Sequence, residues 1–216
     1  MIVHQLFGFL GDKIMSKMFA DNQCKVKQFC SNNNYEYKLW SPDDEDDLFV
    51  GYEKYKPLYD SVRFSIMKVD IIRFIVLHKY GGVYLDLDIE PVIDKLKPYT
   101  FASNIKMIKN RKLYEIEILQ SCKDNPILLQ YLDYVITQVQ EKDKIDVYKD
   151  WKWRYIMHTT GPCCFTRFIK KKNISIQEYK TNHCFVDVKK KVSEFNIVGD
   201  EDFISHPSVS WLKDIL

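Results

Sequence analysis

The chain has 216 residues, of which 46% are hydrophobic and 29% charged, and its aromatic content is high. These fractions are typical of a globular protein and exclude a wholly disordered or collagen-like chain. Lys and Arg together number 32 against 30 Asp and Glu, so the net charge is only +2. A dedicated nucleic-acid-binding domain usually has a larger basic excess, and we expect no nucleic-acid partner.

The beginning of the chain predicts a strand, a helix and a second strand. Ile2–Phe9 is a short apolar run, and Asp12 can cap a helix. Tyr35–Trp40 alternates as a strand does, and Ser41-Pro42 ends it. Acidic residues 43–47 then favour the first turn of a helix, where negative charge is stabilised, over a metal site. The apolar positions of the helix after Asp12 recur at helical spacing: Ile14, Met15, Met18 and Phe19.

The middle of the chain continues the alternation. Ser65–Tyr80 predicts a largely buried helix that Gly81-Gly82 ends, Val83–Leu87 predicts a strand, and a further helix follows Pro126. Alternating strands and helices indicate an α/β fold with a mainly parallel sheet flanked by helices. We find no linker or repeat, and therefore interpret 1–216 as a single domain, either a whole enzyme or one domain of a larger one.

The cysteines, the apolar stretches and the lysine runs indicate no further site. The six cysteines show no CxxC spacing, and Cys163 and Cys164 are adjacent, which favours free thiols in a reducing compartment. No stretch reaches the roughly 18 uninterrupted apolar residues of a membrane span. The lysines at 170–172 and 189–191 are interpreted as solvated faces, with contact to a membrane or an acidic acceptor as the lesser alternative.

Asp70 and Arg73 lie three residues apart in the predicted helix and so share one of its faces. This face is polar in an otherwise apolar helix, and a buried charge needs a partner or a ligand. Two interpretations are open at this point. The residues form a local ion pair that fixes the helix, or they contact a bound ligand.

Asp86 and Asp88 stand at the end of the predicted strand, with Tyr84 on the same side because side chains alternate along a strand. Ligands of open α/β sheets bind at the carboxyl ends of the strands. Two carboxylates there form a pair of hard oxygen ligands suited to Mg²⁺ or Mn²⁺. A DxD alone is a weak signal. A DxD directly after a buried helix, a Gly-Gly turn and an apolar strand is a stronger one.

The sequence resembles the DXD-containing sugar transferases of glycosyltransferase family 32, of the capsular polysaccharide or mannosyltransferase type, and more distantly the glucosyltransferase domain of the large clostridial toxins. The core signature, D-x-x-R followed by G-G-x-Y-x-D-x-D, is matched from Asp70 to Asp88. The remaining matches occur in order from residue 2 to residue 211, so the resemblance covers nearly the whole chain. They are the strand Ile2–Gly8, the strand Tyr35–Trp40, Thr160-Gly161-Pro162, and the closing segment His206–Trp211.

The resemblance implies a GT-A fold, a single Rossmann-like domain that binds a nucleotide sugar, most often a UDP-sugar, with Mn²⁺ or Mg²⁺. It assigns Asp88 to the metal directly, and Asp86 to the ribose and, through water, to the metal. Asp70 and Arg73 would hold hydroxyls of the donor sugar, so that the two acids of the DxD and these two residues are the candidate catalytic set. His206 would be a further metal ligand or diphosphate contact. The other donor-binding residues that it implies are Phe7, Tyr84, Ser208, Ser210 and Trp211.

The function that the resemblance implies is the transfer of a hexose from a UDP-sugar such as UDP-glucose to a glycan or glycoprotein acceptor, with retention of the anomeric configuration. We also expect a cytoplasmic enzyme of viral or bacterial type, acting in the host cytoplasm if virus-encoded. The alternatives are a catalytically silent nucleotide- or glycan-binding module and a nucleotidyltransferase, which lacks support because no Gly-rich basic loop opens the chain. A haloacid-dehalogenase-type phosphatase also has a DxD after an apolar strand, but it needs Thr or Val where Glu90 stands, which counts against that class.

Overall fold

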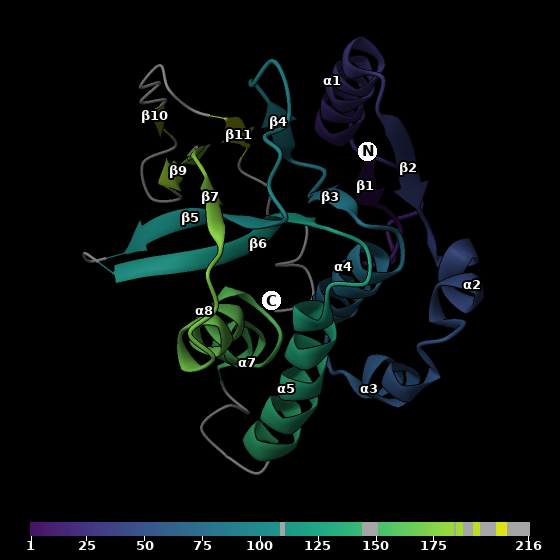
Figure 1. Cartoon of the computed structure of the whole chain (residues 1–216), viewed down its shortest axis with the longest axis vertical. Coiled ribbons are helices and arrows are strands. Elements are labelled where there is room, and N and C mark those ends of the chain that lie inside the picture. Colours follow the sequence, from purple (N-terminus) through teal and green to yellow (C-terminus); the bar gives the residue numbers. More distant parts are fainter. Residues whose placement is uncertain (109–110, 144–150, 184, 188–191, 195–201, 207–216) are drawn as a thin grey trace.

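The computed structural model describes residues 1–108, 111–143, 151–183, 185–187, 192–194 and 202–206. Its centre is a six-stranded sheet with the strand order β2-β1-β3-β6-β5-β7 (Figure 1). Strand β6 runs antiparallel to both β3 and β5, whereas the other pairs are parallel. The predicted mainly parallel sheet is therefore confirmed. The strands are β1 Ile2–Leu6, β2 Glu36–Trp40, β3 Gly82–Leu85, β5 Phe101–Ile108, β6 Arg111–Ser121 and β7 Gln177–Tyr179.

Helices cover both faces of this sheet. On one face, α1 (Lys17–Asn33) packs its buried Val26 and Phe29 against Val3 and Leu85. The other face is covered by the long helix α4 (Ser65–Tyr80) and by the remaining helices, with one continuous apolar core between them and the sheet. The remaining helical elements are η1 Pro42–Asp44, α2 Glu45–Phe49, η2 Glu53–Tyr55, α3 Lys56–Ser61, α5 Pro126–Lys142, α7 Lys152–Thr159 and α8 Pro162–Lys171.

Two small sheets complete the described part of the chain. One joins β4, β11 and β8, and the other pairs β9 with β10; both lie on the α1 side of the central sheet in Figure 1. None of the helices in the described ranges is long and apolar enough to span a membrane. The strands of the small sheets are β4 Ile89–Pro91, β8 Thr181–His183, β9 Phe185–Asp187, β10 Val192–Glu194 and β11 Phe203–Ser205.

The first strand and the first helix differ from their predicted bounds. The strand ends at Leu6 because Gly8 takes a φ of +89°, which turns the chain away from the sheet. The helix begins after Ser16, whose hydroxyl accepts a hydrogen bond from the backbone N of Phe19 at 3.3 Å, and not after Asp12. Ile14 is 88% exposed, so it does not belong to the apolar face of a helix. The predicted cap at Asp12 is wrong.

The Gly-Gly turn after α4 is required by close packing. A Cβ at Gly82 would lie 2.2 Å from the carbonyl oxygen of Ile2, and one at Gly81 would lie 2.6 Å from the backbone N of Lys123. His4 fixes the same turn, because its Nε2 donates to the carbonyl of Gly81 at 2.7 Å while its Nδ1 accepts from the Trp40 indole. Burial lowers the pKa of His4 to about 4, which keeps this ring neutral. His4 therefore has a structural role in this turn.

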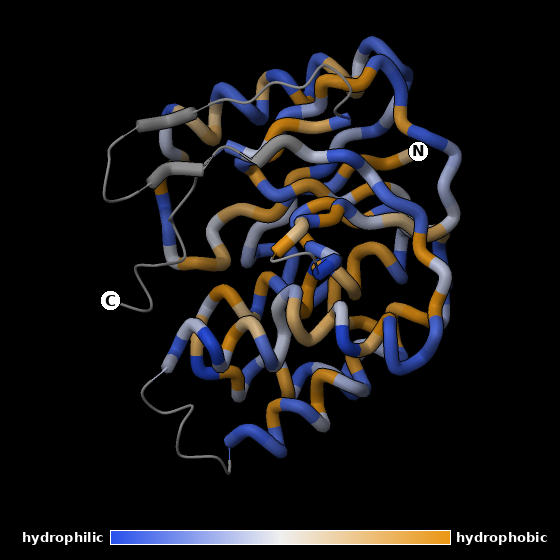
Figure 2. Tube along the Cα trace, turned by 90° about the vertical axis from the view of Figure 1, so that its left-hand side faces the viewer, coloured by the Kyte–Doolittle hydropathy of each residue, from blue (hydrophilic) through white to orange (hydrophobic). Residues whose placement is uncertain are grey.

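The acidic run behaves as predicted. The Asp44 carboxylate accepts hydrogen bonds from the backbone N and the hydroxyl of Ser41 in a capping box. The first turn of α2 contains Glu45, Asp46 and Asp47. Glu45 is also bonded to Lys56 and to the hydroxyl of Tyr59, which ties α2 to α3. Along the helices that cover the sheet, hydrophobic and hydrophilic stretches alternate (Figure 2), as expected of elements with one face in the core.

Candidate functional site

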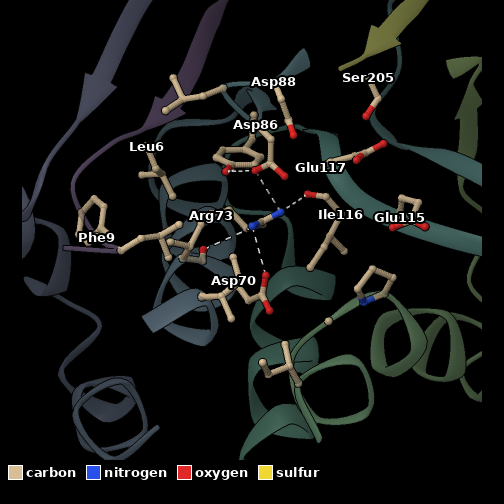
Figure 3. Close-up of a pocket in the computed structure, with 18 of the residues that line it drawn as sticks. Leu6, Phe9, Asp70, Arg73, Asp86, Asp88, Glu115, Ile116, Glu117 and Ser205 are labelled. Carbon is tan, nitrogen blue, oxygen red and sulfur yellow. Dashed lines mark hydrogen bonds and ion pairs between the residues drawn. The ribbon is translucent and has the colours of Figure 1, made fainter. Parts of the chain in front are cut away.

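A pocket of about 420 Å³ opens at the carboxyl ends of β1 and β3, where the rule for open α/β sheets places ligands. Figure 3 shows its side chains converging from β1, α4, β6 and the turn after β3. The volume falls in the range of small-molecule sites, about 300–1,000 Å³. Among the described residues, its lining includes six carboxylates: Asp12, Asp70, Asp86, Asp88, Glu115 and Glu117.

The turn that carries the two aspartates is held through its backbone. Strand β3 ends at Leu85, earlier than predicted, so that residues 86–88 lie in a turn and Leu87 lines the pocket as well. Each carbonyl of this turn accepts a hydrogen bond from a different element. The donors are Gln5 and the backbone N of Ile89 for Asp86, Asn22 of α1 for Leu87, and the backbone N of His206 for Asp88.

Strand β6 bulges where it passes the aspartates. Between the pairs Ser103↔Leu119 and Ile105↔Tyr114, β5 advances by two residues and β6 by five, so β6 contains three extra residues. Such bulges bend a strand and re-aim its side chains. Here the bulge brings both Glu115 and Glu117 to the pocket. The backbone N of Asp86 donates to the carbonyl of Glu117 at 2.9 Å, which sets the acidic turn beside the bulge.

Arg73 joins the bulge to the aspartates. Its Nη1 donates to the carbonyl of Ile116 at 2.6 Å, a group that the bulge releases from strand pairing. Its Nη2 lies 3.2 Å from Asp70 Oδ1 and its Nη1 lies 3.5 Å from Asp86 Oδ1. The guanidinium also stacks on Tyr84, 4.7 Å from the ring centroid. Arg73 is only 2% exposed, so it acts chiefly as the buried cation that holds the two acids together.

Asp70 has a second buried partner. The Thr160 hydroxyl donates to Asp70 Oδ2 at 2.6 Å, and the Thr160 carbonyl in turn accepts from the Tyr131 hydroxyl at 2.5 Å. Thr160 stands at the carboxyl end of α7, just before Pro162 begins α8. The interpretation of Asp70 and Arg73 as an ion pair is confirmed. Both residues also line the pocket, and their contact with a bound ligand stays a prediction.

The carboxylates of the pocket raise one another's pKa. Burial, together with neighbouring acids, raises the pKa of Glu117 well above its ordinary value and that of Glu115 to about 7. Burial raises the pKa of Asp70 and Asp86 too, while Arg73 opposes the rise in both. A cation bound at this end of the pocket would oppose these rises in pKa, so the crowding of carboxyl groups favours its binding.

The residues fit a divalent cation in kind and in charge. Asp86, Asp88 and Glu117 present hard oxygen ligands beside one another, which Mg²⁺ and Mn²⁺ prefer. In the described part of the chain, however, no three His, Cys, Asp or Glu side chains already converge on one metal position. An ion held here would need ligands from a second molecule, as Mg²⁺ usually does when it binds with substrate phosphates.

The remaining predicted site residues fall into three groups. Phe7 lines the pocket at the end of β1, and Tyr84 lines it while donating its hydroxyl hydrogen to Asp86. His206 lines it too, but its Nε2 bonds to Glu90 Oε2 at 2.8 Å, an oxygen that Lys25 also contacts. A metal contact of His206 stays a prediction. Outside the described residues lie Ser208, Ser210 and Trp211.

Sequence reasoning missed Glu115, Glu117 and the role of Thr160. The two glutamates interrupt an apolar strand, Leu113–Gln120, and this was the available signal. Strand alternation alone does not show that they face the aspartates, because the bulge decides it. Thr160 belongs to the Thr-Gly-Pro match, but its contact with Asp70 joins residues 90 positions apart, which no local pattern predicts.

Comparisons with known proteins agree with this geometry. Residues 20–107 match the model of the glycosyltransferase sugar-binding region containing the DXD motif. Inositol phosphoceramide mannosyltransferase 1 of Schizosaccharomyces pombe is 31% identical over 107 residues, which are 46% of this chain and 32% of that protein. Inositol phosphoceramide mannosyltransferase 3 of the same yeast is 39% identical over 57 residues, 26% of this chain and 16% of that protein. The chain thus spans a third or less of the length of these relatives.

Among solved structures, the PaToxG glycosyltransferase superposes with a TM-score of 0.57 at 17% identity, covering 79% of this chain and 69% of that one. At this identity the likeness concerns the fold alone, and it is that of GT-A glycosyltransferases.

A mainly parallel sheet with a DxD turn at its carboxyl edge, in a pocket shared with Asp70 and Arg73, is the arrangement of a GT-A fold. Residues 20–107, which contain this turn, are similar to the DXD-containing glycosyltransferase sugar-binding region. The resemblance to the DXD-containing sugar transferases is confirmed.

Proposed function

We propose that the chain transfers a hexose from a nucleoside-diphosphate sugar to a glycan or glycoconjugate acceptor, with a divalent cation and with retention of configuration. The observation that supports this most is the placement of Asp86 and Asp88 in one pocket with Asp70 and Arg73, within the matched sugar-binding region. A UDP-sugar is the first donor to test. A mannose donor is the second, because the yeast relatives are named as mannosyltransferases.

In this proposal the buried groups orient the donor before reaction. Thr160 and Arg73 fix the two oxygens of Asp70, so that the carboxylate can accept hydrogen bonds from sugar hydroxyls without reorganising. Asp86, set by Arg73 and Tyr84, faces the diphosphate end of the pocket together with Asp88. Phe7 offers an aromatic ring at the edge nearest β1, in the place proposed for the base.

A divalent cation bound by Asp88 and Asp86 would neutralise the negative charge that develops on the leaving diphosphate. The ionised carboxylates at this end of the pocket are negative, and a cation bound beside them would also lower the raised pKa of Glu115 and Glu117. Charge of the same sign would repel a bare diphosphate, so we expect donor binding to depend on the metal. Same-face attack by the acceptor hydroxyl would retain the configuration and needs no dedicated nucleophile.

The test is turnover of a donor panel by the whole chain. UDP-glucose, UDP-galactose, UDP-N-acetylglucosamine and GDP-mannose are each incubated with protein and Mn²⁺, and the released sugar is followed by NMR, which also reports its anomeric configuration. We expect one donor to be hydrolysed slowly, with retention, and only with the metal. Metal-dependent binding of a donor without any release, even with glycan acceptors added, would favour the silent binding module instead.

A further inference from the structure

Exposed apolar side chains gather in two short segments. In the described part of the chain, Met107 and Ile108 at the end of β5 are 60% and 46% exposed, and Trp151 and Trp153 at the start of α7 are 54% and 48% exposed. The other large apolar side chains that are exposed there lie singly, as Val50 does in the turn after α2. Single exposed apolar residues are ordinary, whereas a group of them usually marks an interaction surface.

The two segments meet at the mouth of the pocket. Ile108 and Trp153 both line its outer end, together with Leu113 of β6. The end of the β5–β6 hairpin projects to the left in Figure 1 and toward the viewer in Figure 2, away from the sheet core. We name the four residues Met107, Ile108, Trp151 and Trp153 the outer patch.

Positive charge surrounds the outer patch. No Asp or Glu occurs at the end of β5 (105–108), at the start of β6 (111–114) or around the start of α7 (151–155). The guanidinium of Arg154 lies 4.8 Å from the centroid of the Trp151 ring. Glu178 compensates the charge of Lys112, while Lys170 of α8 reaches the carbonyl of Lys112 and brings a further cation to the hairpin. The basic residues within these three ranges are Lys106, Arg111, Lys112, Lys152 and Arg154.

We propose that the outer patch seats the protein on an anionic lipid bilayer. Trp side chains prefer the boundary between headgroups and acyl chains, where their rings are buried and their N–H groups stay hydrated. Lys and Arg beside them bind anionic headgroups and extend their apolar stems into the same boundary. The basic residues beside the patch favour a lipid surface with negative headgroups. In this orientation the mouth of the pocket faces the bilayer.

The inference goes beyond the proposed function and its test requires no turnover, so the two can fail separately. The whole chain is floated with vesicles of phosphatidylcholine alone and of phosphatidylcholine with phosphatidylserine, and tryptophan emission is recorded. We expect flotation with the anionic vesicles, at least about tenfold weaker flotation with the neutral ones, and a blue shift of the emission.

Two variants locate the surface. Met107→Ser with Trp151→Ser removes apolar contacts outside the pocket lining and should weaken flotation by about tenfold or more. Arg111→Glu with Lys152→Glu keeps the apolar residues and should weaken binding to anionic vesicles only. Val50→Ser, at a residue that is 64% exposed but lies away from the hairpin, is the matched control and should float as the unaltered protein does.

Flotation that is absent with both vesicles would overturn the proposal. The proposal would also be overturned if Val50→Ser lost as much flotation as the double variants, or if both double variants still bound the anionic vesicles. Equal retention of the protein by heparin beads, with no blue shift on vesicles, would assign the patch to a soluble polyanion instead. Circular dichroism of each variant confirms that the fold is retained, and the charge-reversal variant serves if the apolar one does not fold.

Discussion

The two ends of the pocket are stabilised by different forces. At the inner end, Asp70, Arg73 and Asp86 are charged, largely removed from water and linked to one another. At the outer end, Ile108 and Trp153 are apolar and about half exposed. A buried charge that loses its partner is costly, whereas an exposed apolar residue contributes little to folding. Substitutions should therefore affect the two ends very differently.

The largest effect is expected for Arg73→Leu. This change leaves Asp70, Asp86 and the carbonyl of Ile116 without their buried cation, and we expect the free energy of unfolding to fall by about 3–5 kcal/mol. Chemical denaturation of this variant and of Arg63→Leu, which removes a partly exposed arginine paired with Asp143, gives the comparison. A loss no larger than that of Arg63→Leu would show that the network adds little to stability.

Asp88→Ala tests the chemistry of the inner end without opening its core. The side chain lies in the turn after β3, so the fold should persist. Donor hydrolysis should fall by about 10²–10³-fold, because Asp88 is a proposed ligand of the cation that neutralises the leaving diphosphate. Asp94→Ala, at an exposed aspartate a few residues further on, is the control. Full activity in Asp88→Ala would contradict the assignment of the site.

Thr160→Val separates positioning from contact with the sugar. It removes the hydroxyl that donates to Asp70 at nearly constant volume, and we expect a loss of stability of about 1.5–3 kcal/mol together with a higher KM for the donor. Thr160→Ser keeps the donor group and should restore KM. If the serine variant has the same raised KM as the valine variant, the hydrogen bond is not what positions Asp70.

Glu115 lies between the two ends and gives a pH signature. Its pKa in the folded protein, about 7, lies above the ordinary 4.5, so the folded state binds this proton more tightly than the unfolded state. The contribution of Glu115 to stability is therefore present below about pH 4.5 and lost as the pH rises to about 7. Denaturation across this window should show a shallower fall in stability for Glu115→Gln than for the unaltered protein. If stability fell equally with pH in both proteins, the raised pKa of Glu115 would be contradicted.

The smallest effect is expected at the outer end. Ile108→Ser should change the unfolding free energy by no more than about 0.5 kcal/mol, since the side chain is already exposed. The affinity of this variant for UDP should stay within about twofold of that of the unaltered protein. Thermal melts and calorimetry measure the two quantities, and a large change in either would mean that the outer end supports the inner one.

The difference between the two ends also explains what could be predicted from sequence. Asp70, Arg73, Asp86 and Asp88 lie within 19 consecutive residues whose helix, turn and strand order follows from local periodicity and two glycines. The early end of β3 was not foreseen, because the turn is fixed by hydrogen bonds from Asn22 and His206, on segments distant in sequence.

What sequence did not reveal depends on register and on distant contacts. The side of β6 that Glu115 and Glu117 face depends on a bulge that no single-strand pattern encodes. The contact of Thr160 with Asp70 joins the carboxyl end of α7 to α4, two elements distant in sequence. The helix start was predicted at Asp12 because an acidic residue precedes apolar ones, but the Ser16 hydroxyl provides the cap.

Calorimetric titration of UDP into the unaltered protein, with and without Mn²⁺, tests most directly whether the acidic inner end is a metal-dependent donor site. The account predicts binding with Mn²⁺ that is lost in Asp88→Ala and retained in Asp94→Ala, and little or no binding without the metal. Equally strong binding in the absence of Mn²⁺, or in Asp88→Ala, would contradict it. If UDP does not bind under either condition, GDP takes its place in the same titration, and failure of both would contradict the donor site itself.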